Sequence, residues 1–229
     1  MATSKTQRIG ILVIAVVMII GTVFSFFAII LQNSNAQIDA ERQSAQQEEL
    51  QKEYEKYNDE VVAYQEEVSK ENEEIEKKYA SLIKEYEDRP DGFDNSKITE
   101  LEKKDLKKGD GEEVKDIDSV RAYYIGWNAD GEVFDSSIGE GGTMQPPIAV
   151  VGTIQGWQDG VMGMNIGGVR ELSIPSELAY GDQEVGDDIP ANSSLKFVVV
   201  ALPASKIKEP EMSEKLRELL DQVAPNMGM

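Results

Sequence analysis

The fold is decided by residues 154–181, which read IQGWQDGVMGMNIGGVRELSIPSELAYG. Residues 156–164 have helical spacing of their larger apolar residues, and Trp157 and Val161 fall on one side. Residues 169–175 are instead rich in β-forming residues. The stretch therefore predicts a short helix followed by a strand.

Strand-like runs flank this stretch on both sides and are separated by turn signals. They cover residues 119–127, 133–135, 148–151 and 194–202. Asp130-Gly131 lies between the first two runs and marks a hairpin. We expect an α+β domain in which an antiparallel β-sheet is wrapped on one short α-helix.

A family resemblance rests on five ordered segments of this region. They are Tyr124-Ile125-Gly126 leading to residues 130–137, Ile154-Gln155-Gly156-Trp157 leading to Gly163-Met164, Ile174-Pro175 leading to Ala179-Tyr180-Gly181, Ile189-Pro190, and Leu195-Lys196-Phe197. In this order and at these spacings, residues 97–204 resemble the FKBP family, the macrolide-binding peptidyl-prolyl isomerases. The resemblance implies an FKBP-like fold and isomerisation of X-Pro bonds in polypeptide substrates, with macrolides of the FKBP class as inhibitors.

The resemblance also implies an apolar bowl as the catalytic site. Trp157 would form its floor, and its walls would be Tyr124, Phe134 and Phe197. The same aromatic residues, taken singly, would more often belong to the core of a small sheet domain than to a ligand-binding site.

Polar groups complete the implied site. The backbone amide of Ile154 and the phenol of Tyr180 would donate hydrogen bonds to the substrate, and Asp135 would lie at the rim. The substrate would also contact Ile148, Thr153 and Ile189. Val185 stands where many members of the family have His, in a loop that is strongly acidic in this chain.

Composition excludes several classes of chemistry. The 229 residues include no Cys and no His, so disulfides, thiol nucleophiles and His-based catalysis are absent, and we expect no metal and no cofactor. The formal net charge of −20 makes nucleic acid a poor partner. Twisting an X-Pro amide moves no proton and breaks no bond, so this reaction loses nothing from the missing residues.

The N-terminal region predicts a membrane anchor. Residues 9–31 carry no charge and would span about 34 Å as a helix, enough to cross a bilayer core of about 30 Å. The basic residues in 1–8 favour a cytoplasmic N-terminus and an extracytoplasmic remainder. The alternative is a cleaved signal peptide, which would leave a secreted protein, because Ser34-Asn35-Ala36 offers small residues for cleavage.

A long helical stalk is expected over residues 37–88. Residues 36–96 hold 19 acidic against 8 basic residues, and no Pro or Gly occurs before Pro90. A heptad-like apolar stripe predicts a coiled coil and a possible homodimer. It comprises Leu50, Tyr54, Tyr57, Val61, Tyr64 and Val68, then Ile75, Tyr79, Leu82 and Tyr86. The alternatives are an amphipathic helix that packs on its own domain and a solvated single helix.

Two functions remain open at this point. The first is a membrane-anchored isomerase that accelerates X-Pro bond isomerisation in extracytoplasmic proteins and has a possible folding-chaperone role. The second is an FKBP-like binding module with little turnover that organises a surface assembly through the stalk. A short helix over 211–224 completes the expected organisation.

Overall fold

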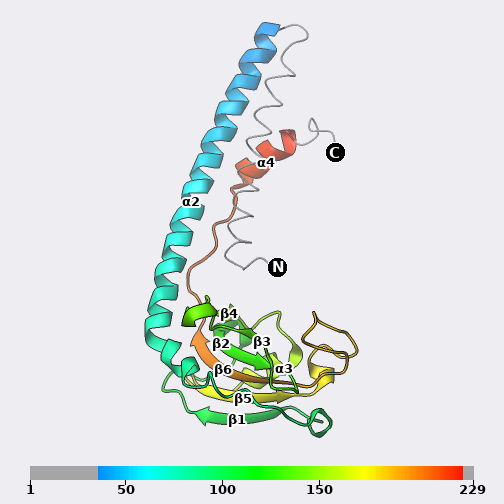
Figure 1. Cartoon of the computed structure of the whole chain (residues 1–229). Helices are drawn as coiled ribbons and strands as arrows, with labels where there is room; N and C mark the ends of the chain where they lie inside the picture. Colours follow the sequence, from blue (N-terminus) through cyan, green and yellow to red (C-terminus); the bar gives the residue numbers. More distant parts are fainter. Residues whose placement is uncertain (1–35, 224–229) are drawn as a thin grey trace. The chain divides into compact units, whose positions relative to one another are not determined.

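The computed structural model describes residues 36–223, which fall into two compact units (Figure 1). Among these residues, one unit comprises 36–63 with 209–223, and the other comprises Tyr64–Lys208. The expected segments 1–8 and 9–31 lie outside the described residues. Among the helices that are described, none combines the length and the apolar character needed to cross a membrane.

The second unit is built on one antiparallel sheet. Its strands are β1 (Glu102–Lys107), β2 (Val120–Trp127), β3 (Val133–Ser136), β4 (Ile148–Ala149), β5 (Val169–Ile174) and β6 (Leu195–Pro203). They lie in the order β1-β5-β6-β2-β3, with β4 beside β2 (Figure 1). Single 3₁₀ turns occur at Asn95–Lys97, Ile117–Ser119, Glu140–Gly142 and Ser176–Leu178. The α+β prediction and the hairpin at Asp130-Gly131 are confirmed, and Gly131 has the positive φ of 85° that such a turn favours.

The central strands are buried on both faces because the sheet separates two apolar cores. Alternate residues of a strand point to opposite faces, so neighbours on β2 enter different cores. Tyr124 joins one cluster, whereas Tyr123, Ile125 and Trp127 join the other. This two-sided burial explains why β2 and β6 read as nearly continuous apolar runs.

Helix α3 (Gln155–Val161) packs on the first face, as predicted from residues 156–164. Two glycines allow it to lie very close to β5. An added Cβ would come within 2.3 Å of the Ile174 side chain at Gly156 and within 2.6 Å of the Leu172 side chain at Gly160. The backbone of α3 therefore rests directly on the apolar side chains of the strand.

The end of helix α2 (Ala36–Lys84) packs on the second face. Ile75, Tyr79 and Ile83 are buried there, with Ile83 fully enclosed. An ion pair of 2.9 Å between Arg121 of β2 and Glu71 strengthens this contact. For this part of the expected stripe, the alternative of a helix that packs on its own domain is therefore correct, and Ile75 and Tyr79 are not free to form a coiled coil.

Helix α2 ends at Lys84, four residues before the expected end of the stalk at residue 88. After Lys84 the backbone hydrogen bonds shorten from a separation of four residues to three, as in the bonds from Tyr86 to Ile83 and from Arg89 to Tyr86. Arg89 then forms an ion pair of 2.6 Å with Glu171 of β5. The turn thus fixes the chain to the sheet before Pro90 is reached.

The first unit contains the beginning of α2 and helix α4 (Glu214–Val223). Lys215 pairs with Glu49 at 2.5 Å, and the Ser213 hydroxyl donates to Glu53 at 3.2 Å. The predicted C-terminal helix is present, and its apolar residues Leu216 and Leu219 are buried.

Strand β1 was not predicted from the sequence. Its residues Glu102–Lys107 read EKKDLK, without the β-branched or aromatic residues that mark strands. It forms because β5 offers a free edge, to which Glu102 through Asp105 and then Lys107 pair in antiparallel register, with an irregularity at Leu106. Residues 102–107 therefore form a strand because of their backbone pairing with β5, and not because of the β-propensity of their side chains.

Candidate active site

Four aromatic rings meet on the α3 face of the sheet, each supplied by a different element. Trp157 of α3 lies between Tyr124 of β2 and Phe197 of β6, with ring centroids 5.2 and 5.3 Å away. Phe134 of β3 lies 5.6 Å from Phe197. All three ring pairs are close to perpendicular, the edge-to-face geometry that aromatic quadrupoles favour. The structure thus brings together the four aromatic residues expected to form the floor and walls.

Gly126 makes this closure of the rings possible. A Cβ at this position would lie 2.5 Å from the Phe197 ring and 2.9 Å from the tip of Phe134. The sequence alone did not indicate that Gly126 makes room for the two rings. Its position within the family string was the available signal that its missing side chain matters to the site.

Tyr124 and Asp135 form the polar edge of the cluster. The Tyr124 hydroxyl donates a hydrogen bond of 2.5 Å to Oδ2 of Asp135, while Oδ1 accepts the backbone amide of Ser136. Tyr124 is 8% exposed, and Asp135 is exposed. Burial, and then the bond to Asp135, raise the pKa of the Tyr124 hydroxyl far above its ordinary value. The phenol therefore stays protonated and fixed in direction.

Tyr180 lies near the same edge with its hydroxyl available. It is 38% exposed, and its hydroxyl forms no hydrogen bond with the part of the chain that the structure describes. Burial, followed by the charge of Asp135, raises its pKa. The Tyr180 hydroxyl is thus a protonated donor with its hydrogen-bonding capacity unused.

The amide of Ile154 is a second unused donor. Ile154 is the N-terminal cap of α3, and its carbonyl accepts bonds from Trp157 and Gln158 at 3.0 and 3.3 Å. Its own N–H donates to no group among residues 36–223, and its side chain packs against the aromatic core. The expected donor role of this amide is therefore compatible with the geometry.

The three further residues expected to contact substrate have different surroundings. Ile189 is 3% exposed and belongs to the core around Trp157, and Ile148 packs against that core. Thr153 donates its hydroxyl to the Val150 carbonyl at 2.6 Å. That hydroxyl is committed to a turn, so Thr153 would contribute shape rather than a donor.

The loop that carries Val185 is exposed and acidic. Its base is closed by the bond from the Val185 amide to the Ile189 carbonyl, 2.9 Å long. Its carboxylates are Asp182, Glu184, Asp187 and Asp188, all exposed. Within the described residues, no group of three or more acidic side chains is arranged to hold a metal ion.

The region that carries the sheet, the short helix and the aromatic cluster is similar in sequence to known proteins. Residues 110–202 match the family of FKBP-type peptidyl-prolyl cis-trans isomerases. An FK506-binding protein of Neisseria meningitidis is 38% identical over 98 residues, which are 43% of this chain and 90% of that protein. The chain belongs to the FKBP-type peptidyl-prolyl cis-trans isomerase family.

Other relatives are matched over less of their length. An FK506-binding protein 2 of Dictyostelium discoideum is 43% identical over 86 residues, 38% of this chain and 65% of that protein. A relative of the same name from Yarrowia lipolytica is matched over 56% of its length. A crystal structure of a peptidyl-prolyl cis-trans isomerase from Pseudomonas syringae has 29% identity and a TM-score of 0.40, covering 46% of this chain and 76% of that one.

Proposed function

We propose that the unit Tyr64–Lys208 catalyses the cis–trans isomerisation of X-Pro bonds in polypeptides. The observation that supports this function best is a pair of unused donors beside a tight aromatic cluster. The Ile154 amide and the Tyr180 hydroxyl donate no hydrogen bond among the described residues. The neighbouring rings of Tyr124, Trp157 and Phe197 would contact a proline ring.

The reaction is a rotation about the C–N bond. The planar amide is stabilised by resonance, and the barrier to twisting is about 18–20 kcal/mol. Because the planar amide is more dipolar than the twisted one, a dry aromatic site disfavours the ground state relative to the transition state. The Ile154 amide and the Tyr180 hydroxyl would hold the flanking carbonyls in the twisted geometry.

The required stabilisation is within reach of these groups. An acceleration of about 10⁵ corresponds to about 7 kcal/mol, at about 1.36 kcal/mol for each factor of ten. Desolvation by Trp157 and its neighbouring rings would combine with two oriented hydrogen bonds to supply it. Tyr124, held by Asp135, keeps the wall of the site in one orientation.

An X-Pro isomerisation assay on the purified full chain tests this function. We expect catalysis at micromolar enzyme, blocked by an FKBP-directed macrolide. A rate equal to the uncatalysed one, together with macrolide or proline-peptide binding, would instead establish the binding module without turnover. Loss of both catalysis and binding would contradict the site itself.

Replacing Tyr180 by Phe should lower catalysis without weakening the fold. The Tyr180 hydroxyl bonds to nothing among the described residues, so its removal leaves no partner unsatisfied. We expect kcat/KM to fall about 2- to 10-fold, the factor of one neutral hydrogen bond, with the melting temperature nearly unchanged. A variant that melts early but keeps the full rate would show that the phenol is structural.

The proposed location is the extracytoplasmic side of a membrane. Residues 9–31 have the length and apolar character of a single span, and the basic residues before them favour a cytoplasmic N-terminus. The isomerase unit would then act on exported chains and assist their folding. If cleavage follows the apolar run, the same unit would be secreted.

Self-association is proposed for the part of the stripe that is not used by the sheet. Leu50, Tyr54, Tyr57, Val61, Tyr64 and Val68 lie on one side of α2 at heptad spacing and are half-buried. The strong negative charge of this region opposes pairing of two such helices. Association should therefore strengthen as salt rises from low to physiological concentration.

Two neighbouring valines allow a controlled test of this dimer. Val61 belongs to the stripe, whereas Val62 is 46% exposed on another side of α2. In sedimentation equilibrium of the detergent-solubilised chain, Val61→Glu should yield a monomer, while Val62→Glu should behave as the wild type. A wild-type monomer at low and physiological salt would leave α2 as a spacer.

A further inference from the structure

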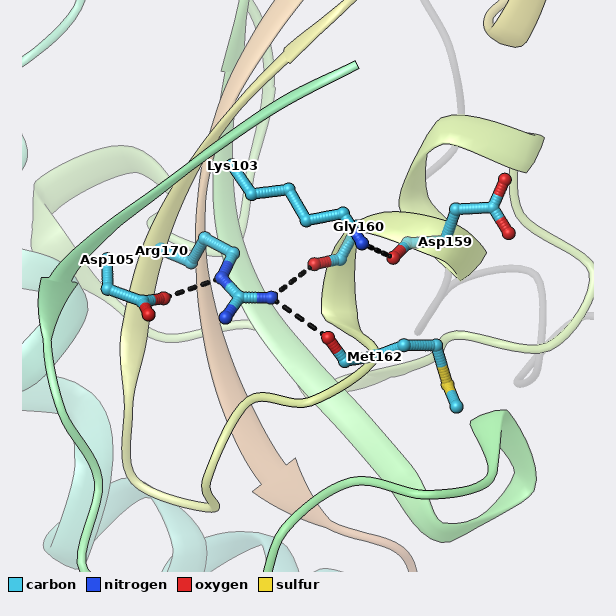
Figure 2. A network of polar contacts seen from close by, with 6 residues as sticks. All are labelled: Lys103, Asp105, Asp159, Gly160, Met162 and Arg170. Atoms are coloured by element: carbon cyan, nitrogen blue, oxygen red, sulfur yellow. Dashed lines mark hydrogen bonds and ion pairs between the residues drawn. The ribbon is translucent and has the colours of Figure 1, made fainter.

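The carbonyl groups at the end of α3 are bound by cationic side chains from two adjacent strands. Lys103 of β1 donates to the Asp159 carbonyl at 2.5 Å. Arg170 of β5 donates from one nitrogen to the carbonyls of Gly160 and Met162, at 2.8 and 3.0 Å. Figure 2 shows both side chains reaching the same end of the helix.

The remaining bond of this network connects the two strands. Nε of Arg170 donates to Asp105 of β1 at 2.6 Å (Figure 2). The Arg170 side chain is 8% exposed, whereas that of Asp105 is 64% exposed. The guanidinium is therefore held in a buried position, and its charge is balanced by a carboxylate at the surface.

These bonds add a directional restraint to the packing of α3. The helix backbone rests on β5 at Gly156 and Gly160, which have no side chains to interlock with the strand, while Trp157 and Val161 are buried in the core beside them. Glycine contacts set how closely the helix approaches but resist sliding and tilting weakly. The bonds to Asp159, Gly160 and Met162 fix the helix end in these directions, and they also satisfy carbonyls that a helix end leaves free.

We propose that Lys103 and Arg170, the latter oriented by Asp105, are positioning residues for Trp157, so that strand β1 sets the place of the site's aromatic floor. Trp157 lies less than one helical turn before Gly160, so a shift of the helix end moves the indole. Neither cation is among the residues expected to contact substrate. The expected change in kcat/KM rests on the proposed isomerase function, whereas the positioning of Trp157 does not.

Two adjacent lysines on β1 supply a matched test. Lys103 binds the end of α3, whereas Lys104 is exposed and has no partner among the described residues. The full chain would carry Trp127→Phe, which leaves Trp157 as its one tryptophan. Into this background we would place Lys103→Met, Lys104→Met, Asp105→Asn, Arg170→Lys and Arg170→Met.

Native-state emission and acrylamide quenching of Trp157, well below the melting temperature, report its position without requiring catalysis. We expect Lys103→Met and Arg170→Met to change both signals and to lower kcat/KM, the first by at least about threefold and the second by about tenfold or more. Arg170→Lys, which keeps the cation, should recover part of the loss. Lys104→Met should match the background protein.

The outcomes separate the inference from the function. If Lys103→Met and Asp105→Asn lower the melting temperature but leave Trp157 emission, quenching and kcat/KM unchanged, the network is only structural and the proposal is overturned. If the background protein has no isomerase activity yet its Trp157 signals respond to Lys103→Met, positioning stands and the proposed function fails. If Arg170→Met does not fold, Lys103→Met and Asp105→Asn provide the test.

Discussion

A chain that begins at Gly92 is expected to lose the cooperative unfolding transition that a chain beginning at Tyr64 shows. The shorter chain lacks Ile75, Tyr79 and Ile83, which cover the second face of the sheet. Burial of each such side chain contributes about 1.5–3 kcal/mol. Their removal also exposes seven sheet residues: Tyr123, Ile125, Trp127, Val169, Val198, Val200 and Leu202. The loss is comparable to the whole stability of a typical domain, about 5–15 kcal/mol.

Thermal and urea unfolding of chains covering 64–208 and 92–208 provide the measurement. The first should unfold in one steep transition, and the second should show a broad transition or bind a hydrophobic dye. Point substitutions in the full chain separate packing from truncation. Ile83→Ala should cost about 2–5 kcal/mol, since Ile83 is fully buried, whereas Val62→Ala should cost little because that side chain is exposed. Equal stability of both fragments would contradict the role of α2 as part of this unit's core.

The second large effect is expected from Trp157→Ala, which should abolish catalysis and destabilise the unit together. Truncating a buried tryptophan costs about 3–5 kcal/mol, and Trp157 is 3% exposed. The indole contacts both Tyr124 and Phe197, so its loss also removes the surface on which a proline ring would rest. Stability and activity are therefore both affected, and a control must separate them.

Trp127 provides that control because it is equally buried on the opposite face of the sheet. It is 2% exposed, and its indole N–H donates to the Asp91 carbonyl at 3.1 Å, away from the α3 face. Trp127→Ala should cost a similar amount of stability but keep most of kcat/KM at temperatures where the variant is folded. If both variants lose activity in proportion to their unfolded fraction, Trp157 has no role beyond the core.

The fold was largely predictable because its strongest signals are local. The turn at Asp130-Gly131, the strand runs and the short helix each depend on residues close in sequence. The cover of the second face was not predictable in the same way. The expected stripe followed Ile75, Tyr79, Leu82 and Tyr86, whereas the helix turns a wider face to the sheet, centred on the fully buried Ile83.

The site was predictable in its membership but not in its geometry. The order of the family strings was sufficient to assemble Tyr124, Phe134, Trp157 and Phe197, which the structure brings together. The unused donors at Ile154 and Tyr180 become visible only when every hydrogen bond around them is known. Arg170 and Asp105 are 65 residues apart, and no local pattern links a charged edge strand to a helix end.

The composition of β1 has a consequence if the proposed isomerase acts on unfolded chains. An open sheet edge is a template on which an extended polypeptide can add as a further strand and begin to aggregate. Five of the six residues of β1 are charged, so such an addition would bring a client chain against a row of solvated charges. The opposite edge, β3, is only four residues long. Addition of a client chain to either sheet edge would therefore be disfavoured, and the proposed contact with a client would be limited to the cluster of Tyr124, Phe134, Trp157 and Phe197.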